Sequence, residues 1–400
     1  MTHTPAGSPL AEDAPLLRAV REGTADDVRA LLDAGADPNA FVNPDGNTDV
    51  RIPLLYFACV ADNVPVVALL LERGADPNDG ESVFHSAELD YRACLELLLA
   101  HGADISHAHA VWGNTPLYFL AGYPEHHPHG ASVVRGMSWL LEHGADPNVP
   151  SHTAPGHDGM PGVAETPLHR MAHHGRLDIA RLLLTHDAAV DTPRADGRTA
   201  YVLAMRAGHT DLAELLAEHG ADTTRLTPVD QLVAAVMRAD ERAARALLSS
   251  SPALMRELTG EDRQAMNRAA ELGRADAIRL MAALGWPLAD EGPWGGTPLH
   301  WAAWFGHPDA VRALIALGAP VNVRDSMYGS SPIAWASHGS TNSHPGHDDD
   351  YVVITDLLLD AGATRAESFN KWDEAPEGMA SAAVAERLRA RGFTAGMPSS

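Results

Sequence analysis

The sequence is poor in lysine and in positive charge. Lys371 is its single lysine, and its 29 basic residues stand against 53 acidic ones, which gives a formal net charge of −24. A surface this acidic repels phosphate backbones and anionic lipids, so we expect neither nucleic acid nor a membrane as a partner. The lack of lysine, together with much alanine, is typical of a GC-rich genome and indicates a bacterial source.

Cysteine and long apolar runs are also scarce. The two cysteines, Cys59 and Cys94, lie in separate helix-like runs and are expected to be small apolar core residues in a reducing cytosol. No stretch reaches the ~18 consecutive apolar residues that a membrane-spanning helix needs, and residues 1–14 show no secretion signal. We therefore expect a cytoplasmic protein. With 45% hydrophobic residues, the chain can bury a continuous core.

Sequence motifs for catalysis are missing as well. There is no Gly-x-Ser-x-Gly, no phosphate-binding glycine-rich loop ahead of Lys-Ser/Thr, and no Gly-x-Gly-x-x-Gly after a strand. Ser249, Ser250 and Ser251 form a run that ordinary turn chemistry explains. We expect no enzymatic activity, no catalytic residues, no cofactor and no bound metal.

What the sequence does contain is a repeated phrase. Gly-Ala-Asp-Pro-Asn begins at Gly35, Gly74 and Gly144. Shortened versions follow leucines farther along the chain, at Gly102, Gly220, Gly318 and Gly362. A chain that repeats its own turn signals in this way is built from stacked units. Stacked repeats mostly make surfaces that hold partners, so the repetition favours binding over chemistry.

Two segments define the unit most clearly. One begins with Thr-Pro-Leu-His at Thr297 and continues through an alanine pair to Gly306-His307, and the other begins with the same four residues at Thr166. Threonine caps a helix and proline suits its first position. The glycine ends that helix in a left-handed conformation that other residues adopt only at a cost. The pattern closely resembles the ankyrin repeat.

This resemblance implies an all-α fold, an ankyrin-repeat solenoid of about ten helix-turn-helix repeats with hairpin loops. The units are residues 14–47, 48–80, 81–110, 111–164, 165–195, 196–226, 227–258, 259–291, 292–325 and 326–372. The seventh and eighth units lack the Thr-Pro-Leu-His opening. We divide the chain into a flexible N-terminus (1–13), the solenoid (14–374) and a C-terminal capping helix with a tail (375–400). Residues 377–394 are expected to form that helix, which closes the last repeat.

The resemblance also implies where a partner binds. In the ankyrin arrangement the inner helices line a concave groove, and the two residues before the inner-helix glycine point into it, together with the hairpin tips. In the C-terminal half of this sequence those positions are richer in aromatic, Arg, Met and His side chains than the acidic chain as a whole, and several of these types are enriched where interfaces carry most of their energy. The candidates are Tyr123, His173, His174, Arg206, Met237, Arg238, Trp304, Phe305, His338 and the hairpin-tip residues Trp112 and Trp294.

The sharpest candidate patch is Trp304 next to Phe305, with Trp335 and His338 one unit later. Packing of these rings on the adjacent repeat is the alternative explanation. The resemblance implies protein–protein binding as the activity, so we expect a non-catalytic, monomeric interaction module that binds another protein. A narrower version is an antitoxin or immunity-type protein whose acidic surface neutralises a basic partner.

An alternative function belongs to another class. Loops inserted at 121–132, 149–164 and 338–350, besides one at 40–52, interrupt the repeat. A metal-dependent enzyme or small-molecule binder would build its site from the first three, because inserted loops are where a protein departs from its scaffold. Its signature would be convergence within metal-ligand distance among His126, His129, His157, His344 or Asp348.

Overall fold

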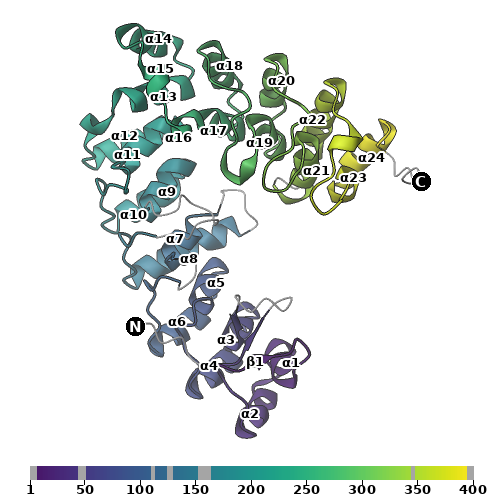
Figure 1. The fold of residues 1–400 in the computed structure, drawn as a ribbon. Helices are drawn as coiled ribbons and strands as arrows, with labels where there is room; N and C mark the ends of the chain where they lie inside the picture. The colour runs from purple at the N-terminus through teal and green to yellow at the C-terminus, as the bar shows by residue number, and fades with distance from the viewer. Residues whose placement is uncertain are drawn as a thin grey trace. The chain divides into compact units, whose positions relative to one another are not determined.

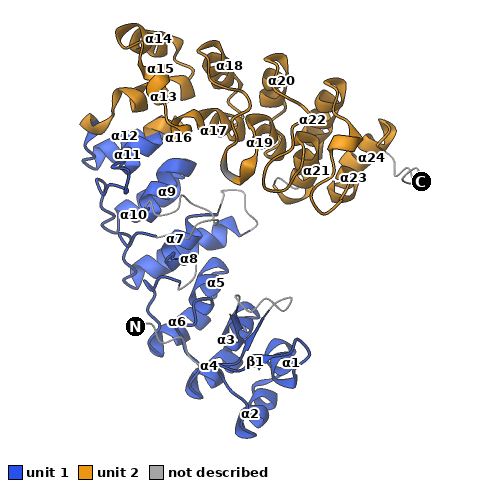
Figure 2. Cartoon of the chain, viewed as in Figure 1, with its two compact units in different colours: residues 1–204, 211–223 blue, residues 205–210, 224–400 orange. Residues whose placement is uncertain are grey.

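The computed structural model describes residues 7–43, 51–109, 113–123, 129–151, 164–343 and 347–393. The chain divides into two compact units, residues 1–204 with 211–223 and residues 205–210 with 224–400 (Figure 2). Each unit is a series of short helices that alternate between two rows (Figure 1). This is the all-α repeat architecture that the sequence predicts.

Unit 1 consists of helix pairs and a small sheet, whose strands flank the first pair in the chain. In one row α3 packs between α1 and α5, and in the other α4 packs between α2 and α6. Its elements are β1 (Pro9–Leu10), α1 (Pro15–Glu22), α2 (Ala25–Asp33), β2 (Phe41–Val42), β3 (Ile52–Pro53), α3 (Leu54–Val60), α4 (Val64–Glu72), α5 (Ser82–Glu88), α6 (Arg92–Ala100), α7 (Pro116–Leu120), α8 (Gly130–Glu142), α9 (Pro167–His174), α10 (Leu177–Leu184), α11 (Ala200–Ala207) and α12 (Thr210–Glu218).

Unit 2 continues the alternation, although the chain boundary with unit 1 falls within α11. Here α19 packs between α17 and α21, and α20 packs between α18 and α22. Its elements are η2 (Thr223–Arg225), α13 (Pro228–Met237), α14 (Glu241–Ser250), α15 (Leu254–Glu257), α16 (Gly260–Arg263), α17 (Ala265–Glu271), α18 (Ala275–Ala283), η3 (Pro293–Gly295), α19 (Pro298–Trp304), α20 (Pro308–Ala316), α21 (Pro332–Asn342), α22 (Asp348–Asp360), η4 (Arg365–Glu367), α23 (Pro376–Met379) and α24 (Ala382–Ala390).

The Thr-Pro-Leu-His opening acts as a helix cap, as predicted. At the start of α19 the main-chain N–H of Thr297 donates to Nδ1 of His300 at 3.1 Å, and the two side chains lie 2.9 Å apart. With Nδ1 accepting, Nε2 of His300 carries the proton and donates to the carbonyl oxygen of Ser330, 3.0 Å away in the next loop. The buried histidine therefore ties one repeat to the next.

The two repeats without this opening use a related cap. Thr227 and Thr259 begin α13 and α16, and an aspartate three residues later replaces the histidine. The hydroxyl of Thr227 donates to Asp230 at 2.6 Å, and that of Thr259 donates to Asp262 at 2.7 Å. The caps place two carboxylates where the fifth and ninth repeats have the imidazoles of His169 and His300.

Left-handed residues end the inner helices. Gly306 follows α19 with φ = 70° and Gly175 follows α9 with φ = 76°, the conformation that the repeat pattern predicts for these glycines. In three weaker repeats Asp62, Asp90 and Ala239 take the same conformation without being glycine. The repeat rhythm therefore survives substitution of its glycine, at a local cost in backbone strain.

The N-terminal segment differs from the expectation of a flexible end. Residues 9–10 form strand β1, which pairs in parallel with β2, and β2 pairs antiparallel with β3. The side chain of Asp37 accepts hydrogen bonds from the main chain and the hydroxyl of Ser8. The lengthened first hairpin loop thus supplies two strands that hold the N-terminal segment.

The region 338–350 is not the inserted loop that we expected. Helix α21 continues to Asn342, and α22 begins at Asp348. Gly339 lies within α21 and does not end it. Polar side chains beside it donate hydrogen bonds to the preceding turn, from Ser340 to the carbonyl oxygen of Ser337 and from Asn342 to that of His338. Acidic residues open α22, where they suit the positive end of the helix dipole.

The C-terminal helix is interrupted. In place of one helix over 377–394 the chain forms α23 and α24, separated by Ala380 in an extended conformation. Helix α24 packs against α21 and α22. Arg387 reinforces the contact through two 2.7 Å hydrogen bonds to the carboxylate of Asp356 on α22.

Candidate functional site

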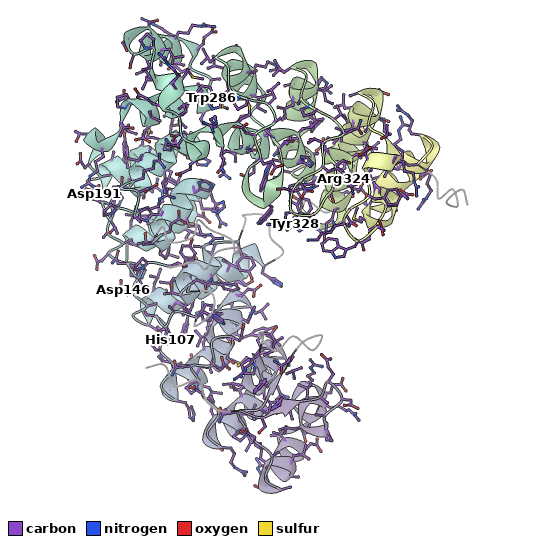
Figure 3. All side chains as sticks on the ribbon, in the orientation of Figure 1. His107, Asp146, Asp191, Trp286, Arg324 and Tyr328 are labelled. Atoms are coloured by element: carbon purple, nitrogen blue, oxygen red, sulfur yellow. The ribbon has the colours of Figure 1, made fainter. Side chains whose placement is uncertain are left out.

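An aromatic pocket of about 250 Å³ lies among the C-terminal repeats of unit 2. Helices α19, α21 and α23, the tip residue of η3 and two loops supply its walls. Tyr328, in the loop between α20 and α21, is labelled in Figure 3. We call this site the aromatic pocket; its lining residues are Trp294, Trp304, Tyr328, Ser330, Ala334, Trp335, His338, Asn370, Trp372, Glu374 and Met379.

The rings of the aromatic pocket contact one another. The ring of Trp335 lies at the centre, with its centroid 5.9 Å from that of Trp304 and 6.4 Å from that of Tyr328, both edge-on. The ring of His338 lies 5.4 Å from Trp304, and the ring of Trp372 lies 6.3 Å from Tyr328. These separations are in the range where aromatic pairs attract, so the walls support each other.

A buried carboxylate fixes this arrangement. Asp325 is 3% exposed, and it accepts a hydrogen bond from Nε1 of Trp335 at 3.0 Å and from the main-chain N–H of Ser330 at 2.8 Å. It also accepts from the main-chain N–H groups of Met327 and Tyr328. One side chain therefore shapes the loop and orients the central indole.

The nearby His300 is neutral at physiological pH. Burial lowers its pKa to about 4, although Ser330 and the charge of Asp325 act in the opposite direction. His300 therefore provides no positive charge to balance the carboxylate of Asp325.

Two tryptophans of the pocket are unusually exposed. Trp372 is 60% and Trp294 is 38% exposed. Trp294 also has φ = 59°, a rare conformation for a bulky residue, and its ring stacks 5.6 Å from that of Trp301. Strained and exposed aromatic residues are typical of functional sites rather than of cores.

Three of the predicted partner-binding residues come together here. Trp294, Trp304 and His338 all line the aromatic pocket. Phe305 lies beside it, half-buried, with its ring stacked 5.9 Å from that of Trp301. The structure thus brings together residues from the hairpin tip of one repeat and the inner helices of two.

The predicted residues of unit 1 do not share this site. The rings of His173 and His174 meet edge-on, with centroids 5.4 Å apart, at the end of α9. Tyr123 packs edge-on against Phe119 at 5.4 Å, and burial together with the charge of Glu88 raises the pKa of its hydroxyl. Trp112 lies outside the described residues.

Met237 was a wrong prediction, because its side chain is in the core. It is 1% exposed and ends α13. Its Cβ lies close to Gly208 of the preceding repeat, and the guanidinium of Arg274 donates to its carbonyl oxygen at 3.2 Å. The partner-binding position of this repeat is therefore buried.

Arg206 is also occupied within the chain. Its side chain is 10% exposed, and it bridges Asp230 and Asp262, each at 2.7 Å. Asp230 and Asp262 are the carboxylates that cap α13 and α16, so one arginine neutralises both caps. Arg206 is a structural residue, and we withdraw it from the partner-binding surface.

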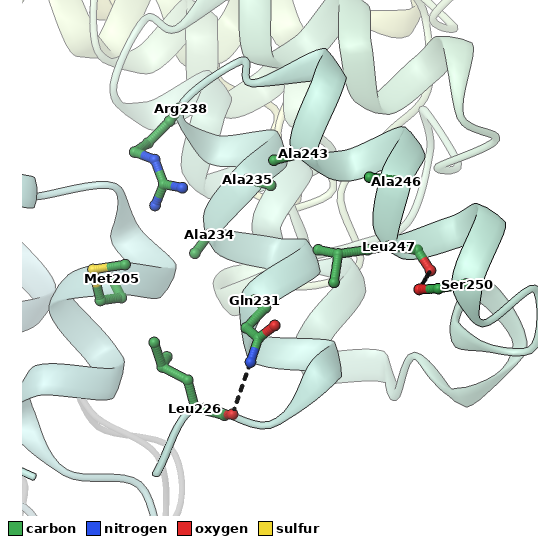
Figure 4. A pocket seen from close by; sticks show the side chains of 10 residues that line it. All are labelled: Met205, Leu226, Gln231, Ala234, Ala235, Arg238, Ala243, Ala246, Leu247 and Ser250. Atoms are coloured by element: carbon green, nitrogen blue, oxygen red, sulfur yellow. Dashed lines mark hydrogen bonds between the residues drawn. The ribbon is translucent and has the colours of Figure 1, made fainter. Parts of the chain in front are cut away.

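Arg238 lines a second, more polar hollow. This hollow has a volume of about 450 Å³ and lies along α13 and α14 (Figure 4). Its floor is made of small residues, among them Ala234 and Ala235, and the side chain of Gln231 is held at its edge by a 3.2 Å hydrogen bond to the carbonyl of Leu226. It contains no aromatic side chain, so it offers less binding energy than the aromatic pocket.

Several residues of the aromatic pocket were missed by the sequence reasoning. Tyr328, Asn370, Trp372 and Glu374 lie in loops whose positions the repeat pattern does not specify. A signal was nevertheless present, since Trp372 directly follows the chain's single lysine in a polar segment. A large aromatic residue in such a segment is expected either to contact a partner or to brace a loop.

The metal-site alternative finds no cluster in the described part of the chain. There, no group of three or more His, Cys, Asp or Glu side chains is placed to hold a metal ion. His129 precedes α8 and Asp348 opens α22, whereas His126, His157 and His344 lie outside the described residues. Among the same described residues, no helix has the length and apolarity needed to cross a membrane.

Comparison with known proteins adds a family. The family model described as ankyrin repeats (3 copies) matches residues 16–109, 129–227 and 232–325, more than half of the chain. The rat cyclin-dependent kinase 4 inhibitor B is 35% identical over 111 residues, which are 26% of this chain and 79% of the inhibitor. The bovine mitochondrial disaggregase is 31% identical over 159 residues, which are 38% of this chain and 22% of the disaggregase.

Two further matches are shorter or weaker. The ankyrin repeat and KH domain-containing protein mask-1 of Caenorhabditis elegans is 34% identical over 128 residues, 32% of this chain and 4% of that protein. The crystal structure of the human ASB11 ankyrin repeat domain superposes with a TM-score of 0.36 at 22% identity, covering 58% of this chain and all of that domain. With the three family matches and the capped, paired helices of both units, the chain belongs to the ankyrin repeat family.

Proposed function

We propose that this chain binds another protein through the C-terminal repeats of unit 2, with the aromatic pocket as the main contact. Ankyrin repeats are protein–protein interaction modules, and the family is typically non-catalytic. The observation that carries the proposal is the pocket itself, in which exposed Trp294 and Trp372 lie beside Trp304 and His338. Tryptophan and tyrosine are the residues most often found at the energetic centres of interfaces.

The rigidity of the site supports the same function. The central indole of Trp335 is fixed by Asp325, and the main chain of Trp304 is fixed by a 2.7 Å hydrogen bond from Tyr351. A site whose walls are already ordered loses little conformational entropy when a partner binds, so more of the contact energy appears as affinity.

The proposal includes the partner class and the setting. We propose a non-catalytic, monomeric protein of the cytoplasm, without nucleic acid or membrane as ligands. The net charge of −24 supports this, because it opposes association with phosphate backbones and anionic lipids. In unit 2 the second hollow near Arg238 and the ring of Phe305 are secondary contacts in this proposal, and within unit 1 Tyr123, His173 and His174 are separate candidate contacts.

A pull-down from a lysate of the source organism tests the proposal. The pocket variant carries Trp294→Ala and Trp372→Ala, because these rings are exposed and their loss is least disruptive to the fold. The matched control carries Leu317→Ala and Val353→Ala, two exposed apolar residues that do not line the pocket. We expect a protein that the wild type and the control retain and the pocket variant loses. Retention of the same proteins by all three would contradict the proposal.

A further inference from the structure

We propose that the aromatic pocket binds an alkylated ammonium group, such as that of a methylated lysine, carried by the partner protein. The inference rests on the proposed function and specifies the chemistry of its partner. The pocket presents the rings of Trp294, Trp304, Tyr328, Trp335 and Trp372. The face of an aromatic ring carries partial negative charge, so several rings around one small space attract a cation, and tryptophan does so most strongly.

The carboxylates around the pocket favour a cation as well. In the described part of the chain neither Asp325 nor Glu374 makes an ion pair. Asp325 is buried directly behind Trp335, and Glu374 lies exposed at the rim with one oxygen accepting from Asn370 at 2.6 Å. A buried carboxylate without a counter-charge is costly, so its field acts on whatever enters the pocket.

The chain itself shows that these rings attract an ammonium group. The Nζ atom of Lys371 lies 4.6 Å from the ring centroid of Trp372 and 5.6 Å from that of Tyr328. It also donates to the carbonyl oxygen of Met327 at 3.0 Å. Lys371 does not line the pocket, so its charge is next to the pocket rather than inside it. A second cation would bind the same rings and experience a modest repulsion from Lys371.

An alkylated cation suits the pocket better than a guanidinium or a free ammonium. The acceptors inside the pocket are already used, since Oδ1 of Asn370 accepts from the main chain of Trp372 and Glu374, and the carbonyl of Ser330 accepts from His300; at the rim, one oxygen of Glu374 accepts from Asn370. A cation with several N–H donors would lose its hydrogen bonds to water and find few acceptors in the pocket, which costs free energy. A methylated ammonium has few or no N–H groups to satisfy.

The size of the pocket agrees with one side-chain head group. Its volume of about 250 Å³ is below the roughly 300–1,000 Å³ of typical small-molecule sites. Ala334 and Met379 add apolar surface to the lining, which suits the methyl groups and the methylene stem of such a side chain.

The test uses three small probes and saturation-transfer NMR with the full-length protein. The probes are N-acetyl-trimethyllysine amide, its neutral isostere with carbon in place of the quaternary nitrogen, and N-acetyl-lysine amide. We expect trimethyllysine to bind at least fivefold more tightly than either of the others, because only it combines positive charge with an alkylated surface. Equal binding of the trimethyllysine probe and the carbon isostere, or no binding of the trimethyllysine probe, would overturn the inference.

Variants locate the effect. Trp372→Ala should weaken trimethyllysine binding at least fivefold, Trp372→Phe should retain most of it, and Lys371→Gln should leave it unchanged or tighten it about twofold. Val353→Ala, outside the pocket, should behave as the wild type. The same affinity in Trp372→Ala as in the wild type would place the probe elsewhere and contradict the proposal. Because the pull-down does not use these probes, failure here leaves the proposed function to be judged separately.

Discussion

The hydroxyl group of Tyr351 donates a hydrogen bond to the main-chain carbonyl oxygen of Trp304 across 2.7 Å. Tyr351 is fully buried in α22, and Trp304 is the last residue of α19. Gly339 of α21 approaches the same carbonyl so closely that an added Cβ would lie 2.4 Å from it. Three helices thus meet at one peptide group, and this contact positions one wall of the aromatic pocket.

Tyr351→Phe should lower the stability of unit 2 by about 1 kcal/mol, because a buried carbonyl loses its donor while the ring remains in place. Thermal unfolding measures the loss of stability. Binding of the partner protein should also weaken, because the Trp304 wall of the aromatic pocket is less well fixed. Tyr91→Phe, on an outer turn of unit 1, serves as the control. An unchanged midpoint in Tyr351→Phe would show that the hydrogen bond adds nothing.

Arg206→Met should be strongly destabilising, by about 3 kcal/mol or more, because it removes the guanidinium that bridges the buried carboxylates of Asp230 and Asp262. Arg245→Met is the matched control: it removes an exposed ion pair with Glu241 and should cost about 0.5 kcal/mol or less. Urea unfolding of both variants measures the difference. Equal effects would mean that Arg206 has no structural role and would return it to the candidate surface.

The stability of unit 1 should depend on pH through His85. Burial lowers the pKa of His85, but hydrogen bonds to Glu81 and Glu88 outweigh it and raise that pKa from 6.5 to about 9. Because the folded pKa is the higher one, this contribution is complete below pH 6.5 and is lost as the pH rises towards 9. The free energy of unfolding should fall by about 1–3 kcal/mol across that interval.

Thermal unfolding between pH 6.5 and 9 measures this slope. The interval avoids Asp79, whose pKa burial raises only to about 6, and Glu81, whose pKa falls to about 2 through His109 and His85 despite its burial. His85→Gln should flatten the profile. A variant with the same slope as the wild type would show that another group titrates.

Gly136→Ala should destabilise unit 1 by about 1–3 kcal/mol, through overpacking. An added Cβ at Gly136 would lie 1.8 Å from the carbonyl oxygen of Ala87, where α8 packs against α5. Gly378→Ala in α23 is the control, because its Cβ would meet nothing within 4 Å, and it should be neutral or slightly stabilising. Comparable unfolding midpoints for the two variants would mean that α8 and α5 separate easily.

Trp294→Asn should separate stability from binding. The exchange loses the stacking on Trp301 but relieves a left-handed conformation that asparagine adopts readily, and these effects are each about 1 kcal/mol. We expect an unfolding midpoint close to that of the wild type and a weaker interaction with the partner. Retention of the partner at wild-type strength would remove Trp294 from the proposed interface.

The sequence was sufficient to predict the repeats because their signals are local. The cap at Thr297 and the turn at Gly306 each depend on residues a few positions apart, and both were confirmed. The weak repeats were harder to interpret, although Thr227 and Asp230 carry the same cap with a different acid–base group. Interpreting Asp230 as a substitute for the capping histidine would have predicted a basic side chain of the same chain close to it, as Arg206 is.

The site was only partly predictable because its walls come from distant segments. Trp294, Trp304 and His338 occupy fixed places in the repeat, so their convergence followed from the fold. The position of Trp372 depends on a loop with no repeat pattern, and only tertiary contacts determine it. Met237 failed for a related reason: the burial of its side chain depends on tertiary packing that the local pattern does not specify.

The solitary lysine has a practical consequence. Lys371 is exposed, and its amine rests on Trp372, a wall of the aromatic pocket. Apart from the α-amino group, any acylating dye, crosslinker or lysine-directed enzyme has a single side chain to modify on this chain, and that side chain adjoins the proposed binding site. Whatever is attached there is carried at the mouth of the pocket, so one labelling reaction supplies both a reporter of occupancy and a means of blocking it.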